Sequence, residues 1–161
     1  MNQLLETPPM HLETTRFGPL EVDPSTIVHF PLGLLGFERF ARWIIIDSDA
    51  VAPMRWLQCV EAPDVALLVV EPQLFFADYA PTIGAEDRDF LQLASEEELV
   101  VACVVVVPDD PARMTINLLG PLAFNAAKRV GKQLVLADSQ YSARQRLIPD
   151  LTPADAPVPV G

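Results

Sequence analysis

Short apolar runs rich in Val, Ile, Phe and Trp recur along the chain, separated by Pro, Gly, Asp and Asn. β-Branched and aromatic residues favour strands, and turn residues at such short intervals are typical of an antiparallel sandwich or a small barrel. The sequence therefore predicts an all-β, mainly antiparallel fold: a small, partly closed β-barrel with one short helix. The predicted strands cover residues 26–30, 43–47, 55–60, 66–70, 99–107, 115–119, 122–125 and 133–137.

The most regular alternation of apolar and polar side chains lies near the N-terminus. Residues 14–17 precede a turn at Gly18 and Pro19, and residues 20–23 return with strict alternation. This pattern predicts a hairpin in which Leu20 and Val22 face the core.

Helix is restricted by the 16 prolines of the chain, because an interior proline removes a backbone donor and clashes with the preceding turn. A helix is predicted over residues 85–93, where acidic side chains at the start complement the helix dipole. Residues 38–41 are a second candidate. Ser95 and Glu98 have the spacing of a capping box, but β-branched residues follow, so we predict one turn leading into a strand.

One domain over residues 10–148 accounts for these apolar runs. Residues 1–9 are polar, and residues 149–161 carry four prolines among small or acidic neighbours. Neither end can bury enough surface to order itself, so we expect a flexible N-terminal extension and a Pro-rich flexible tail. The predicted core consists of Leu20, Val22, Trp56, Leu67, Val69, Val104, Val106, Ile116, Leu118, Phe124, Leu134 and Leu136.

The charge balance is strongly acidic, with 22 acidic and 11 basic side chains and a formal net charge of -11. This charge opposes direct binding of nucleic acid. It would steer a basic protein partner toward the surface, or it serves only to keep the protein soluble. The longest apolar run, 99–107, is shorter than the roughly 20 residues of a membrane-spanning helix. With no signal peptide visible at the N-terminus, we expect a cytoplasmic protein without a membrane segment.

Catalytic and metal-binding patterns are weak. Cys59 and Cys103 lie in apolar segments without C-x-x-C spacing, which favours core thiols over a zinc or redox site. His29 stands alone in a predicted strand and favours a structural role over that of a general base. Gly33 and Gly36 lack the further glycines and the lysine of a phosphate loop, so they indicate a turn.

Two acidic clusters, at residues 96–98 and 109–110, are better explained as solvated charge than as a cation site. Neighbouring side chains in extended or turn segments diverge and cannot easily share one ion. The sequence thus predicts no catalytic residue, no cofactor and no metal.

Several polar residues are embedded in apolar strands near turns. Such groups are costly if they are buried without partners, so each is expected to cap a turn or complete a strand edge. The same edge could also accept an extended segment of a partner protein. The candidates for this partner-binding role are Asn117, Asn125, Lys132, Gln133 and Tyr141.

Five strings of the sequence occur in an order and spacing that resemble the FliW family of flagellar assembly factors. They are FGPLEV at 17–22, IVHFPLGLLGFE at 27–38, LFFADY at 74–79, NLLGPLAFN at 117–125, and GKQ at 131–133 leading to SQY at 139–141. Within these strings we expect a structural role, in turns and packing, for six residues: Phe30, Pro31, Gly33, Gly36, Phe37 and Pro121.

The resemblance implies a small β-barrel-like fold without catalysis. It also implies a protein that binds flagellin and that binds and antagonises CsrA, a dimeric RNA-binding repressor of flagellin translation, so that flagellin level is coupled to flagellin translation. The oligomeric state of the chain itself is left open.

The alternative hypothesis is a small β-barrel that binds a ligand or acts as an enzyme, for example one that holds a flavin. A flavin phosphate needs basic side chains or backbone donors, and the sequence shows no Arg or Lys cluster beside a glycine-rich turn. A yellow colour of the purified protein would favour this alternative.

Overall fold

The computed structural model describes residues 8–137 and 140–148. Nearly all of the expected N-terminal extension, 1–9, and the whole expected tail, 149–161, lie outside these residues. The strands are β1 (Met10–Thr14), β2 (Gly18–Val22), β3 (Val28–His29), β4 (Arg42–Ile46), β5 (Arg55–Cys59), β6 (Ala66–Val70), β7 (Leu99–Val106), β8 (Thr115–Ile116), β9 (Leu122–Asn125), β10 (Val130–Gln133) and β11 (Gln145–Arg146). One α-helix, α1 (Ala85–Phe90), is present in the described residues, with 3-10 turns η2 (Pro24–Thr26), η3 (Pro72–Leu74), η4 (Glu96–Glu98) and η5 (Pro111–Arg113).

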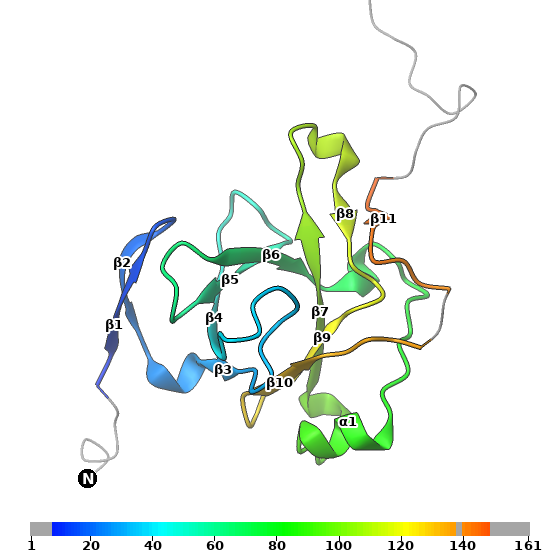
Figure 1. The fold of residues 1–161 in the computed structure, drawn as a ribbon, viewed down its shortest axis with the longest axis horizontal. Helices are drawn as coiled ribbons and strands as arrows, with labels where there is room; N and C mark the ends of the chain where they lie inside the picture. The colour runs from blue at the N-terminus through cyan, green and yellow to red at the C-terminus, as the bar shows by residue number, and fades with distance from the viewer. Residues whose placement is uncertain (1–7, 138–139, 149–161) are drawn as a thin grey trace, which may run out of the picture.

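The barrel is a closed ring in which β7, β6, β5, β4, β3, β10 and β9 follow one another and β9 returns to β7 (Figure 1). Strand β7 closes it by pairing with β9 from Leu99 to Ala102 and with β6 from Cys103 to Val105. Neighbours in the ring are antiparallel except β3 and β10, which are parallel. The predicted mainly antiparallel β-barrel with a short helix is confirmed, and the ring is complete.

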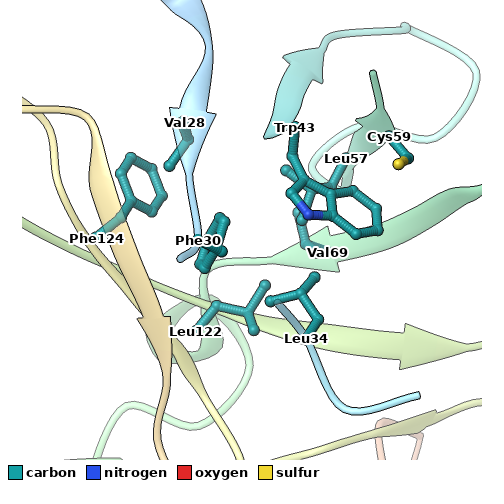
Figure 2. Close-up of a cluster of buried hydrophobic side chains, with 9 residues drawn as sticks. All are labelled: Val28, Phe30, Leu34, Trp43, Leu57, Cys59, Val69, Leu122 and Phe124. Atoms are coloured by element: carbon teal, nitrogen blue, oxygen red, sulfur yellow. The ribbon is translucent and has the colours of Figure 1, made fainter. Parts of the chain in front are cut away.

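The barrel interior holds the main hydrophobic cluster. Side chains from β3, β4, β5, β6 and β9 point into one space, and Leu34 enters from the loop that follows β3 (Figure 2). Leu57 and Cys59 on β5 illustrate the two-residue period that sends alternate side chains inward. A second cluster, which includes Cys103 and Ile116, packs around β6, β7 and β8.

Most of the predicted core is buried or packs against buried residues. Val22, Val69, Ile116, Leu118, Phe124 and Leu134 are buried. Leu20, Trp56, Leu67, Val104 and Leu136 are partly buried against the clusters. Val106 is a wrong prediction, since it is 60% exposed. It is the last residue of β7, in the hairpin with β8 that projects from the ring (Figure 1), one residue beyond the pairing of β7 with β6.

The N-terminal hairpin forms, but its turn precedes the predicted one. Strand β1 ends at Thr14, and residues 15–17 make the turn. The Thr14 hydroxyl accepts a hydrogen bond from Phe17 N at 2.9 Å and donates one to Gly18 O at 2.8 Å. The threonine side chain thus fixes the turn before Gly18, and the prediction of a strand over 14–17 with a turn at Gly18 and Pro19 is wrong.

Two helix predictions change as well. Residues 38–41 form turns rather than a helix, and α1 ends at Phe90 instead of residue 93. The early end of α1 has a local cause, since Gln92 adopts a φ of 56°, which breaks the helix. The single turn predicted between Ser95 and Glu98 is confirmed, and the Glu98 carboxylate accepts a hydrogen bond from Ala94 N at 2.6 Å.

Several strand boundaries differ from the predictions. The segment 26–30 loses its start to η2, strand 115–119 stops at Ile116, and the strand predicted at 133–137 is displaced to Val130–Gln133. Past β10 the chain still follows residues 119–121, because Leu134 N donates to Pro121 O and Leu136 N to Leu119 O. Strand β11 and the first residues of β1 were not predicted, because neither has a distinctive apolar run.

The two cysteines yield a prediction about thiol reactivity. Both are free and buried, and burial raises the pKa of Cys59 and raises the pKa of Cys103 to about 12. Because the thiolate is the reactive species, neither should react with an aromatic disulfide reagent at pH 8 in the folded protein, and both should react in denaturant. Rapid labelling of a native thiol would contradict its burial in the hydrophobic clusters, and Cys59→Ala would show which thiol had reacted.

Candidate functional site

The candidate site is a groove of about 690 Å³ at one end of the barrel. Leu67 of β6 and Val104 of β7 contribute to its lining, together with residues of the loop between β3 and β4 and of the β7–β8 hairpin. The lining is mostly apolar, and two arginines, Arg113 and Arg144, also face it. A concave apolar surface with a few polar groups has the character of a recognition site.

One wall of the groove is the loop that closes this end of the barrel, residues 31–41, here called the plug loop. It lies across the front of the ring in Figure 1. Leu34 is buried in the barrel interior, and Phe37 packs edge to face on Trp43 with ring centroids 6.1 Å apart. The adjacent Leu35 points outward into the groove and is 59% exposed. The plug loop therefore fills the barrel with one leucine and presents the next one to solvent.

Two glycines shape the plug loop. Gly33 has a φ of 70° and its N–H donates to Phe30 O at 2.7 Å. A Cβ at Gly33 would overlap the backbone of Glu38. Gly36 has a φ of 87°, but a Cβ there would meet open space. Glycine is needed at both positions for the backbone conformation, and at Gly33 for space as well.

The other members of the predicted structural set have different environments. Phe30 is buried in the barrel and sits against Gly131, where any Cβ would overlap the phenyl ring. Pro121 is fully buried directly before β9, whereas Pro31 is exposed in the plug loop.

Asn117 and Gln133 come together at the groove, where both line it. The Gln133 side chain accepts a hydrogen bond from Leu35 N at 2.7 Å and donates one to Gly120 O at 2.9 Å. The Asn117 side-chain oxygen Oδ1 accepts a hydrogen bond from Gly120 N at 2.8 Å. Gln133 thus joins the plug loop to the loop 117–120, and Asn117 holds that second loop in shape.

Asn125 and Lys132 lie away from the groove, toward α1. Asn125 is completely buried, donates to Leu91 O at 2.9 Å and accepts from Ala127 N at 2.9 Å. Lys132 forms an ion pair of 2.7 Å with Asp87 of α1. Lys132 thus fastens α1 to β10, and Asn125 fastens the residue that follows α1 to β9. Asn125 supports the surface around α1 from inside.

Tyr141 is the fifth predicted residue and lies apart from both pairs. Its ring packs on Tyr79 with centroids 4.8 Å apart, and its hydroxyl accepts from Ala80 N at 3.3 Å. The Tyr79 hydroxyl in turn donates to Leu118 O at 2.7 Å. Tyr141 therefore packs the segment after residue 140 against the barrel.

The groove also contains residues that the sequence analysis did not propose as site residues. Leu35 and Val106 are more than half exposed, although both are large and apolar. Within the described residues, the guanidinium groups of Arg113 and Arg144 form no ion pair or hydrogen bond. Only the pair Leu34-Leu35 between two glycines offered a sequence signal, because one of two adjacent leucines in a tight loop must face outward.

Other chemistry-bearing residues have structural environments. His29 is exposed on β3, and the Asp110 carboxylate accepts from Ala112 N at the start of η5. Across residues 8–137 and 140–148, no group of three or more His, Cys, Asp or Glu side chains could hold a metal ion. No helix in that part of the chain is long and apolar enough to cross a membrane.

Comparison with known proteins gives a match over this whole architecture. The model of the family described as FliW protein matches residues 11–147, which include the barrel and every residue that lines the groove. The chain belongs to the FliW family. The resemblance seen in the five sequence strings is thereby confirmed.

Individual FliW proteins are similar along most of their length. A flagellar assembly factor FliW of Leptospira biflexa is 36% identical over 85% of this chain and 90% of the relative. One of Moorella thermoacetica is 36% identical over 93% of this chain and 96% of the relative. A crystal structure of the flagellar assembly factor FliW superposes with a TM-score of 0.83 at 26% identity, covering 89% of this chain and 100% of that chain.

The two glycines of the plug loop give a matched pair of variants. We expect Gly33→Ala to lower the free energy of unfolding by roughly 3 kcal/mol, since it combines an unfavourable φ with steric overlap. Gly36→Ala changes only the backbone preference and should cost about 1 kcal/mol. Urea unfolding of both variants measures the difference, and equal losses would mean that the close approach of Gly33 to the Glu38 backbone does not constrain the plug loop.

Proposed function

We propose that this protein binds flagellin and also binds and antagonises the translational regulator CsrA, so that flagellin level controls flagellin translation. Membership of the FliW family over residues 11–147 is the observation that carries the proposal. The curated relatives bear the name of assembly factors, which supports a role through binding rather than catalysis. Because translational control takes place in the cytoplasm, we place the protein there.

The distribution of acidic side chains supports binding to a basic regulator. Glu86 and Asp89 of α1 and Glu97 of η4 are exposed, and within the described residues their carboxylates have no ion-pair partner. The acidic face formed by α1 and η4 would speed association with a basic RNA-binding protein. Once bound, it would also repel the phosphates of incoming RNA.

The groove end of the barrel supports binding of a protein segment. Asn117 and Gln133 border an apolar groove, and Lys132 and Tyr141 lie on the segments that lead away from it. We propose that the partner surface extends from the groove over these residues toward α1, where Asn125 supports it internally by its hydrogen bond to Leu91. Extended segments commonly bind such surfaces through side-chain pockets and backbone hydrogen bonds.

Mutual exclusion of the two partners is the first test. Flagellin is titrated into a preformed complex with fluorescent CsrA, and release of CsrA is followed by anisotropy. If flagellin lowers the affinity for CsrA tenfold, a coupling of about 1.4 kcal/mol, CsrA must lower the affinity for flagellin by the same factor. A stable ternary complex with both affinities unchanged would contradict the switch.

Charge neutralisation on the acidic face is the second test. The variant Glu86→Gln/Asp89→Asn/Glu97→Gln should weaken CsrA binding about three- to tenfold at physiological salt and reduce its salt dependence. The control Asp49→Asn/Asp64→Asn/Asp109→Asn makes the same change of charge at exposed positions elsewhere. Equal losses in both variants would show that net charge alone, and not the face formed by α1 and η4, attracts the regulator.

A further inference from the structure

The groove differs in charge from the rest of the molecule. The chain carries a net charge of -11, yet the ionisable side chains that line the groove are Arg113 and Arg144. Asp109 and Asp110 are on the same hairpin as Arg113 but do not line the groove, and Asp110 binds Ala112 N instead. The groove is therefore an apolar surface with two available positive charges on an acidic protein.

Such a surface selects its occupant by charge. A basic RNA-binding regulator would bring positive charge toward Arg113 and Arg144, which is unfavourable. An apolar segment with a carboxylate satisfies both features, since Leu35 and Val106 can bury its apolar side chains and the arginines can pair with the carboxylate. The electrostatics therefore separate the two proposed partners between the groove and the acidic face of α1 and η4.

We propose that the groove between the plug loop and the β7–β8 hairpin binds an apolar segment of flagellin, with Arg113 and Arg144 holding an acidic side chain of that segment. This inference rests on the proposed function, because it assigns one of the two partners to one surface. Gln133 contributes by fixing Leu35 at the groove wall through its hydrogen bond to Leu35 N.

The apolar wall is tested with the full chain and purified monomeric flagellin, using titration calorimetry. Leu35→Gln/Val106→Gln replaces two exposed side chains that line the groove, and should lower the affinity for flagellin at least about tenfold. The control Leu74→Gln/Val135→Gln replaces two similarly exposed apolar side chains that do not line the groove. It should leave flagellin affinity within about twofold of the unchanged protein.

The positive rim is tested in the same assay. Arg113→Gln/Arg144→Gln should weaken flagellin binding about fivefold and flatten its dependence on salt. Arg42→Gln/Lys128→Gln removes the same charge from exposed positions outside the groove and should have little effect. CsrA affinity should stay within twofold in both groove variants, and unchanged melting temperatures would confirm that all variants fold.

Each outcome separates the inference from the proposed function. Flagellin that binds every variant equally well would overturn the groove assignment and leave the proposed function intact. Failure of the unchanged protein to bind flagellin would refute the proposed function itself. Loss of CsrA binding alone in the groove variants would assign the groove to the regulator. A flagellin affinity that is raised both by the groove substitutions and by deletion of residues 149–161 would overturn the assignment and identify the chain's own tail as the occupant.

Discussion

The closure of the barrel depends on the double pairing of β7. Its first half pairs with β9 and its second half with β6, so one strand satisfies backbone groups on both sides of the seam. A closed ring leaves no open edge between these strands, and it encloses the cluster that contains Trp43, Phe30 and Phe124. The groove is lined by residues of this ring and of the loops that leave it.

The plug loop follows from the closure, because a ring of this size must be filled at its ends. Leu34 and Phe37 fill one end, and the tight geometry at Gly33 lets the loop turn inside the available space. Leu35, pinned by Gln133, is then forced outward beside the β7–β8 hairpin. The groove is thus a consequence of how the barrel is filled. Leu35 makes the groove apolar, while the barrel interior is still filled by Leu34.

Strand β7 also connects the two surfaces proposed for the two partners. It begins at Leu99, directly after the acidic η4, and ends at Val106 in the groove. Asn125 and Lys132 fasten α1 to β9 and β10, which continue toward Gln133 at the groove. Rigid strands that reach both ends offer a physical route by which occupancy of one surface could alter the other, in addition to direct overlap.

The sequence by itself determined the fold class, most strands and most of the core. The reason is that apolar alternation and proline placement are local properties, and they favour strands and disfavour helices wherever they occur. It also marked Asn117 and Gln133 as polar groups that needed partners. Only the tertiary structure decided that Val106 is exposed and that Asn125 is buried. It also decided that Leu35 and two arginines line the same groove as Asn117 and Gln133. Those facts depend on strand register and on contacts between segments about 30 to 100 residues apart, such as Asn125 with Leu91 and Leu35 with Gln133, and no local pattern encodes which distant segments will meet.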